Sequence, residues 1–468
     1  MLTASSEYWR PNGRRSEPPT SPMSAWTALL WLNGIGVLVA IVRFRSCLTM
    51  FLLNQFLVAR ALGNIEAYGQ PISQSYLPGG IFSAANTRLA FALIACTSTI
   101  AVFFAVLPAW ALSKRPSTPA SLPSVPWPIL VAAGLYLALF AMSSETILSS
   151  PYGGDGTLLG IHLGGGELIL VYAVVLYEMY RRVAVARLAP IRALLLLLAM
   201  CVATEYLKGR TGIASGLMIG GTLLFLRPRG PSVRRVLLIV SVIGAIGVAG
   251  AATRAIRSQF SSIGSDAITS FSSSLGASER DESIAQTGQG AEAYGNGTQY
   301  AAHVLECIQL WESGTSREWR SIYLPLEYTF EPNILSGIFS FERSKEAAWE
   351  LADYYIHGGG VYVVGEFYWN GGWACVLVMT TALCAFMFLC DTRCHNGGFW
   401  ALMVCAFSPG LYMGIGYGFA QVSRGMFNGI WFVVGMALLS RWRRARRVGA
   451  GTVEQDTGPR HAAVPVEG

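Results

Sequence analysis

Long apolar segments separated by short polar connections make up most of this chain. A helix needs about 20 apolar residues to cross the hydrocarbon core of a bilayer. Segments of suitable length and character are residues 25–42, 89–110, 127–147, 167–180, 191–207, 213–226, 236–252, 362–390, 399–419 and 425–439. A further segment, residues 47–61, is weaker because Asn54 and Gln55 interrupt it. The pattern predicts an all-α polytopic membrane protein with about 10 or 11 transmembrane helices.

One long polar stretch, residues 254–361, separates the early apolar segments from the late ones. It carries more than half of the chain's 27 acidic residues. These acids are Asp266, Glu279, Asp281, Glu282, Glu292, Glu306, Glu312, Glu318, Glu327, Glu331, Glu342, Glu346, Glu350 and Asp353. A chain that only filled a bilayer would not need this stretch. We therefore expect a large extracytoplasmic loop domain that serves chemistry or recognition at one membrane face.

The same pattern gives the domain organisation. The predicted parts are a polar N-terminal tail (1–24), the first part of the transmembrane bundle (25–253), the loop domain (254–361), the last part of the bundle (362–440) and a basic cytoplasmic tail (441–468). Within the loop domain, apolar residues recur at helical spacing over residues 300–311 and 342–355. Aromatic residues are dense between these two segments. We expect a folded cap of short helices.

Composition narrows the class of protein. Apolar residues make up 53% of the chain and charged residues 13%, which excludes a soluble enzyme held by a single membrane anchor. No nucleic-acid partner is expected.

Nine cysteines lie mostly in apolar segments, where cysteine behaves as a small apolar residue. Cys390, Cys394 and His395 lie close together, but three such residues without a fourth ligand more often have no metal role. We expect neither a metal nor a cofactor.

Positive charge predicts the orientation, because cytoplasmic loops near helix ends collect Lys and Arg. Such clusters occur over residues 114–115, 181–187, 227–235 and 441–447. Alternation between them places the loop domain outside and the C-terminus inside. The N-terminus is ambiguous. Its arginines favour the inside, whereas eleven helices with an inside C-terminus require the outside, and this point stays open.

A carboxylate, Glu366, stands at the expected outer end of an apolar helix, within the sequence Gly-Glu-Phe-Tyr-Trp-Asn-Gly-Gly-Trp. An ionisable group at membrane depth is costly unless it is paired or hydrated, so it is a candidate functional residue. Packing against a neighbouring helix is the alternative role. His357 lies shortly before it and could act as a base or as a phosphate partner. A solvated surface histidine is the alternative there.

A second signal is cationic. Lys208 and Arg210 stand in a very short connection on the side that should be poor in cations, next to glycine. Arg254, Arg257 and Arg424 are expected at the same level of the membrane. Arginine can donate two parallel hydrogen bonds to phosphate oxygens, and the start of a helix offers free backbone amide groups. These residues predict a phosphate-binding site, although any one of them alone could be a cation reaching towards the lipid headgroups.

These motifs together resemble those of the Wzy-type O-antigen polymerases, also called oligosaccharide repeat-unit polymerases. The resemblance rests on the Lys-Gly-Arg-Thr-Gly turn that opens a membrane helix, on the large external loop, and on the Gly-Glu-Phe-Tyr-Trp-Asn-Gly-Gly-Trp sequence after a run of glycines. It extends over most of the chain. Gly371 stands where the family commonly has an aromatic residue.

The resemblance implies glycosyl transfer at the outer leaflet of a bacterial cytoplasmic membrane. A growing glycan would move from undecaprenyl pyrophosphate onto a lipid-linked repeat unit. Arg210, Arg254, Arg257, Arg424 and Lys208 would then bind pyrophosphate in place of a metal, and Glu366 or His357 would be the catalytic base. A chain-length-regulating membrane protein would be a possible partner. An O-antigen ligase and a lipid-linked oligosaccharide transporter or flippase are the alternatives, although a transporter is expected to show internal repeats.

Overall fold

The computed structural model describes residues 22–68, 83–108, 124–142, 156–158, 161–163, 165–185, 187–208, 211–226, 241, 295–321, 323, 346–355, 360–394 and 399–454. The helices are α1 (Pro22–Val42), α2 (Ser46–Tyr68), α3 (Ala84–Val106), α4 (Trp127–Met142), α5 (Gly165–Ala184), α6 (Pro190–Lys208), α7 (Thr211–Phe225), α12 (Gly295–Glu312), α15 (Ala347–Tyr354), α16 (Val363–Arg393), α17 (Phe399–Tyr417) and α18 (Phe419–Glu454). The strands β1 (Gly156–Leu158) and β2 (Ile161–Leu163) pair antiparallel as one small hairpin.

The helical class is confirmed. Each predicted apolar segment coincides with a helix, except residues 236–252, which apart from residue 241 fall outside the described residues. Within the described ranges, four helical segments are long and apolar enough to span a membrane: Ala25–Val42, Ser46–Glu66, Ala84–Val106 and Val363–Arg393. Shorter apolar stretches occur in α4, α6, α7 and α17. The total of about 10 or 11 transmembrane helices stays a prediction.

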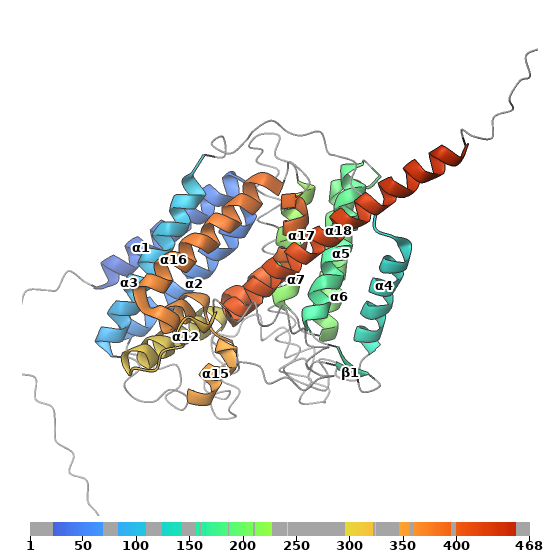
Figure 1. Cartoon of the computed structure of the whole chain (residues 1–468). Coiled ribbons are helices and arrows are strands. Elements are labelled where there is room, and N and C mark those ends of the chain that lie inside the picture. The colour runs from blue at the N-terminus through green and yellow to red at the C-terminus, as the bar shows by residue number, and fades with distance from the viewer. Residues whose placement is uncertain are drawn as a thin grey trace, which may run out of the picture.

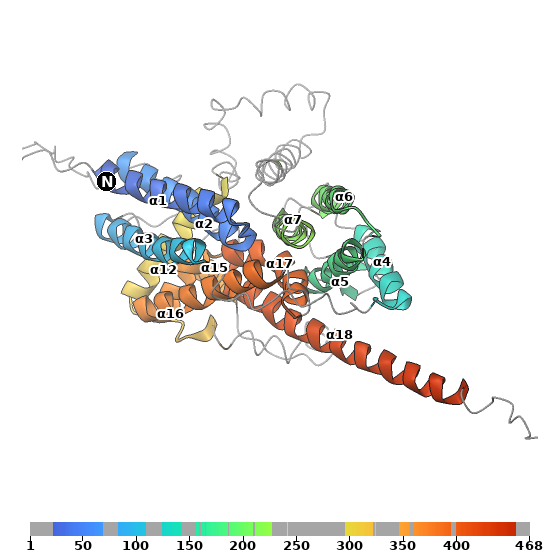
Figure 2. The ribbon, with the colours of Figure 1, turned by 90° about the horizontal axis from the view of Figure 1, so that it is seen from above.

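The helices form two neighbouring groups (Figure 1). Seen from above, α1, α2, α3 and α16 lie together, and α4, α5, α6 and α7 lie on the other side (Figure 2). α17 connects the groups, since it packs against α16 as well as against α5, α7 and α18. Small residues allow the close contact: a Cβ atom added at Gly216 or Gly220 of α7 would clash with Ser408 of α17.

One end of the first group is held together by charged side chains, and we call it the Asp391 end. The carboxylate of Asp391, in α16, accepts the backbone N–H groups of Cys47 (3.0 Å) and Leu48 (3.1 Å) at the start of α2. These amides have no partner inside their own helix, and a carboxylate suits the positive end of the helix dipole. Arg45 donates to the carbonyl groups of Phe104 and Leu107 at the end of α3.

The opposite end, which we call the Glu366 end, is partly covered by the loop domain. Trp26 of α1 donates to Glu66 of α2 there. Asn86, near the start of α3, donates to Gln309 of α12 at 3.0 Å. α12 also packs against α2 and α16. α12 contains the predicted loop-domain helix over residues 300–311, and α15 lies within the predicted helix over residues 342–355, of which residues 342–345 fall outside the described residues.

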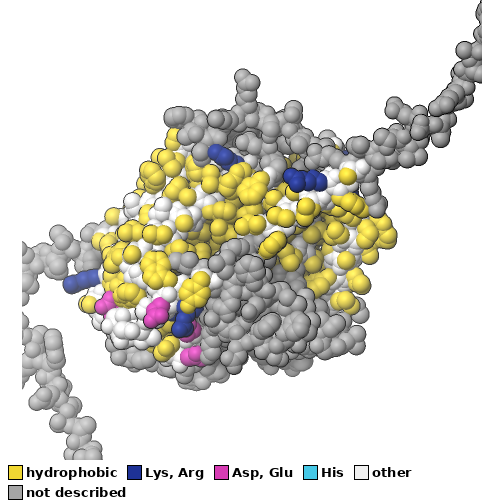
Figure 3. All heavy atoms as spheres, viewed as in Figure 1, with side chains coloured by type: hydrophobic (Ala, Val, Ile, Leu, Met, Phe, Trp, Pro, Cys, Tyr) yellow, Lys and Arg dark blue, Asp and Glu magenta, His cyan; other side chains and the backbone are white. Residues whose placement is uncertain are grey.

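Side chains on the surface follow the same division. Figure 3 shows hydrophobic side chains across the middle of the bundle, with charged side chains towards its upper and lower margins. Exposed large apolar residues include Trp31, Leu38, Phe103, Leu135 and Leu196. A surface this apolar suits contact with lipid.

Candidate functional site

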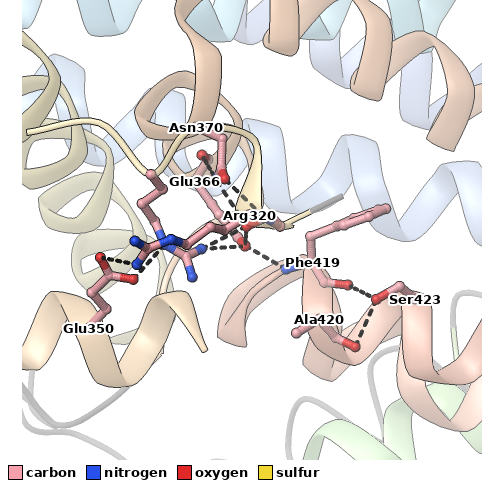
Figure 4. Close-up of polar contacts among 9 residues, drawn as sticks. Arg320, Glu350, Glu366, Asn370, Phe419, Ala420 and Ser423 are labelled. Atoms are coloured by element: carbon pink, nitrogen blue, oxygen red, sulfur yellow. Dashed lines mark hydrogen bonds and ion pairs between the residues drawn. The ribbon is translucent and has the colours of Figure 1, made fainter. Parts of the chain in front are cut away.

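The start of α16 carries the sequence motif around Glu366, and the side chain of Glu366 is fully buried. Three segments meet at this carboxylate: residues 315–321 after α12, α16 itself and the start of α18, while α15 joins them through the bond of Glu350 to Arg317 (Figure 4). We call the contacts among Arg317, Ser321, Glu350, Glu366, Asn370 and the amide of Phe419 the Glu366 network.

Both carboxylate oxygens of Glu366 have hydrogen-bond donors. Oε1 accepts the hydroxyl of Ser321 and lies 3.5 Å from Nη1 of Arg317. Oε2 accepts the backbone N–H of Phe419 at 2.5 Å. The carboxylate is therefore enclosed by one charged and two neutral donors, which offset the loss of water around it.

Arg317 lies between two carboxylates. Its Nε donates to Oε2 of Glu350 at 2.8 Å, and its side chain is fully buried, like that of Glu366. Arg320 adds a partly exposed cation 3.7 Å from the other oxygen of Glu350. Two guanidinium groups thus contact two carboxylates. Removing one member of such a buried set is costly because it leaves an unpaired charge.

Asn370 fixes the hydroxyl of Ser321. Its side-chain amide donates to Oγ of Ser321 (2.9 Å) and to the backbone carbonyl of Glu366 (2.7 Å), while its Oδ1 accepts the N–H of Ser321 (3.0 Å). Nη1 of Arg317 donates to the same hydroxyl at 2.7 Å. The hydroxyl therefore donates once and accepts twice, which is its full hydrogen-bonding capacity.

A break in α16 supplies backbone acceptors to the same segment. Gly371 and Gly372 depart from helical geometry, and Gly372 has φ +59°. Carbonyl groups just before the break accept bonds from outside the helix: Trp369 O from Arg317 N (3.2 Å), and Asn370 O from Trp319 N (3.0 Å). The glycine pair thus lets residues 317–319 dock on α16 by backbone bonds as well as by charge.

A further glycine, at the end of α17, allows the bond to α18. Gly418 has φ +110°, and a Cβ atom there would lie 3.1 Å from Oε2 of Glu366. Only glycine suits both the left-handed conformation and the close approach. The turn ends α17 and presents the first amide of α18, Phe419 N, to the carboxylate. Arg424 stands on α18, five residues beyond Phe419.

The structure describes the backbone of only two of the other predicted site residues. The backbone of Arg424 lies in α18 and that of Lys208 at the end of α6. Arg210, Arg254, Arg257 and His357 fall outside the described residues. Glu366 and the backbone of Arg424 are therefore the two that the structure brings into one neighbourhood.

Sequence reasoning missed the partners of Glu366. Asn370 had a usable signal, since it stands four residues after Glu366 and hence on the same face of a helix. Arg317 and Ser321 had none, because they lie 49 and 45 residues from Glu366 in the chain.

A second buried carboxylate lies in the loop domain, at Glu306 of α12. Its side chain is 1% exposed, and its Oε2 has no hydrogen-bond partner within the described part of the chain. Burial raises the pKa of Glu306 to about 8. Burial, with the nearby Glu306 carboxyl group, also raises the pKa of Tyr355 to about 12. Glu306 thus holds its proton far more strongly than an exposed glutamate does.

Among the described residues, no group of three or more His, Cys, Asp or Glu side chains could hold a metal ion. Cys390 and Cys394 are both buried near the Asp391 end, whereas His395 falls outside the described residues. A scan against protein-family models, and searches of curated proteins and of solved structures, find no match to this chain.

Proposed function

We propose that this chain is an integral membrane polysaccharide polymerase of the bacterial cytoplasmic membrane. It would be a metal-independent glycosyltransferase that moves a growing glycan from undecaprenyl pyrophosphate to a lipid-linked repeat unit on the outer leaflet. The observation that carries the proposal is the setting of Glu366. The most distinctive motif of the sequence forms a buried charge network at one end of an apolar bundle, beside the helix that carries Arg424.

The protein must neutralise the charge of the leaving group and accept a proton in this reaction. The acceptor hydroxyl attacks the anomeric carbon, the bond from that carbon to the pyrophosphate oxygen breaks, and the hydroxyl proton passes to a base. Guanidinium groups can neutralise the charge that develops on the departing pyrophosphate. A base in contact with the hydroxyl contributes typically ~10²–10⁴-fold to such a reaction.

The directions of the helices support the proposal that the pyrophosphate-binding cations lie at the same end of the bundle. The first residue of α18, Phe419, contacts Glu366. Further along α18, Nη1 of Arg443 donates to the carbonyl of Ser124, just before α4, at 2.6 Å. α4 therefore starts far from Glu366. Alternation through α5, α6 and α7 then predicts that the connection between α6 and α7, with Lys208 and Arg210, lies at the Glu366 end.

The contacts of Glu366 do not suit the role of the base. A base needs a free lone pair that faces the acceptor hydroxyl. Both oxygens of Glu366 already accept hydrogen bonds, and no part of its side chain is exposed. We therefore propose His357 as the base, with Arg210, Arg254, Arg257, Arg424 and Lys208 as the pyrophosphate ligands. A chain-length-regulating membrane protein is the proposed partner.

The test is the surface polysaccharide of a deletion strain, resolved on a gel and complemented with variants. We expect the deletion strain to make single repeat units, the wild-type gene to restore long chains, and Arg210→Ala, Arg424→Ala and His357→Ala to fail. Arg441→Ala is the matched control, because Arg441 is an exposed arginine on the same helix as Arg424. It should restore normal chain lengths.

Two outcomes would replace the proposal. Accumulation of full-length polymer on its lipid carrier in the deletion strain would indicate a ligase, which transfers finished glycan. Repeat units trapped at the inner leaflet would indicate a transporter. Normal long chains in the deletion strain would rule out the proposed polymerase function.

A further inference from the structure

The Glu366 network joins the loop domain to α18 through one fully buried ion pair. Arg317 comes from the segment after α12, Glu350 from α15 and Glu366 from α16. The network reaches α18 through the bond from Phe419 N to Glu366. Each connection is made at the level where α18 begins.

We propose that Arg317 and Glu366 are positioning residues that hold the start of α18, and with it Arg424, where the pyrophosphate group binds. The inference rests on the proposed function for the identity of the ligand. Its structural part rests on the described contacts of Glu366, Arg317 and Phe419.

Glu366 controls α18 because its carboxylate occupies the helix N-terminus. The first amides of a helix have no partner inside the helix, and a negative charge next to them is favourable. Gly418 lets the chain turn directly before this point. The position of Phe419 is thus set by a carboxylate on another helix.

Arg424 follows Phe419 by five residues. At about 1.5 Å of rise per residue, this places it about 7 Å further along the helix axis. A shift or rotation of the start of α18 would therefore move the guanidinium of Arg424 by a comparable amount. Electrostatic stabilisation of a leaving group depends on a pre-set donor position, so such a shift should weaken it.

Arg317 itself is unsuited to bind the substrate. Its side chain is fully buried, with Nε on Glu350 and Nη1 on Ser321 and Glu366. Its guanidinium also lies over the ring of Trp369, 5.3 Å from the ring centroid. Its role is to hold the carboxyl group of Glu366 in place.

The experiment measures binding of undecaprenyl pyrophosphate to the purified full-length protein in lipid nanodiscs, with Glu366→Gln, Arg424→Ala and the double variant. Loss of a contact between an arginine and phosphate should weaken binding about 10- to 100-fold. We expect Glu366→Gln to weaken binding within this range. In the Arg424→Ala background it should cause little further loss, because it acts through Arg424.

Glu178→Gln is the matched control. Glu178 is a buried carboxylate paired with Arg181 (2.6 Å) and Arg182 (3.0 Å) on α5, away from the Glu366 network. It should leave binding unchanged. Ser321→Ala provides a milder second variant if Glu366→Gln does not fold, and it should show the same dependence on Arg424.

Independent losses that multiply in the double variant, or unchanged binding by both Glu366→Gln and Ser321→Ala, would overturn the inference. Absence of binding by the wild-type protein would overturn it as well, together with the pyrophosphate assignment. A wild-type protein that binds the lipid and shows the expected coupling but makes no polymer would remove the polymerase alone.

Discussion

At the scale of single residues, Glu306 and Glu366 show two ways to bury a carboxyl group. Glu366 is surrounded by donors and paired with Arg317. Glu306 has no hydrogen-bond partner for its Oε2 among the described residues, and its raised pKa keeps it largely protonated at neutral pH. The first arrangement offsets burial with hydrogen bonds and a cation, whereas the second leaves the carboxyl group to hold its proton.

Glu306 should make the stability of the fold depend on pH. Its pKa in the folded chain, about 8, lies above its ordinary value of 4.5. The folded state therefore binds the proton more tightly, and stability falls as pH rises between these two values. Glu306→Gln replaces the ionisable carboxyl group with a neutral amide, so this variant should be more stable than the wild type. The advantage should grow from about pH 5 to pH 8, towards an upper bound on the order of 3–5 kcal/mol.

Thermal unfolding at several pH values in mild detergent measures this difference. Glu318→Gln is the control, because Glu318 is exposed in the same domain and its replacement should shift stability little. An advantage of Glu306→Gln that does not increase with pH would show that Glu306 is ionised in the folded protein.

The sequence could single out Glu366 because an ionisable residue at the start of an apolar segment is costly by itself. It could not supply the partners. Apart from Asn370, they come from segments 45 to 53 residues away in the chain, and one of them is the backbone amide of Phe419. Glu366 as the catalytic base stays a prediction, and its contacts favour the positioning role.

At the scale of elements, the apolar pattern predicted where helices occur but not where they bend. Residues 362–390 have the composition of one continuous span, yet α16 breaks at Gly371 and Gly372. Asn54 and Gln55 weakened the prediction of the second helix, but in α2 both side chains are buried inside the bundle. Composition alone cannot reveal such burial, because it depends on helices distant in sequence.

The break in α16 makes Gly372 sensitive to substitution. Gly372→Ala would place a side chain at φ +59°, with its Cβ atom 2.9 Å from the ring of Trp311. The backbone conformation alone costs about 1–3 kcal/mol for a residue other than glycine. We expect a lower unfolding temperature and loss of the contacts between residues 317–319 and α16.

Gly435→Ala is the matched control for thermal unfolding. Gly435 is helical, and an added Cβ atom there meets no atom within 4 Å. Alanine favours a helix by up to about 1 kcal/mol relative to glycine, so this variant should be as stable as the wild type or slightly more so. Equal effects of the two substitutions would contradict the assigned strain at Gly372.

At the scale of the whole molecule, the two ends of the bundle fix the relative directions of the helices. α1 starts and α2 finishes at the Glu366 end, where Trp26 contacts Glu66. The connection between these helices lies at the Asp391 end. If the Glu366 end is outside, the N-terminal tail with Arg10, Arg14 and Arg15 is outside too, against the statistics of positive charge.

Reporter fusions test this orientation. Alkaline phosphatase fused after Glu312 should be active, because the loop domain is predicted outside, and a fluorescent protein fused after Arg447 should fluoresce from the cytoplasm. A reporter at the N-terminus should behave as an external one. Fluorescence at the N-terminus would show that α1 or α2 does not cross the membrane.

The saturated hydroxyl of Ser321 has a consequence for how this protein can diverge. It serves Arg317, Glu366 and Asn370 at once and has no hydrogen-bonding capacity left. Exchange of Ser321 leaves each of the other three with an unsatisfied group, and exchange of any one of those three leaves the Ser321 hydroxyl short of a partner. In descendants of this sequence, the four positions should therefore be inherited as a unit or replaced together, while the exposed positions around them drift freely.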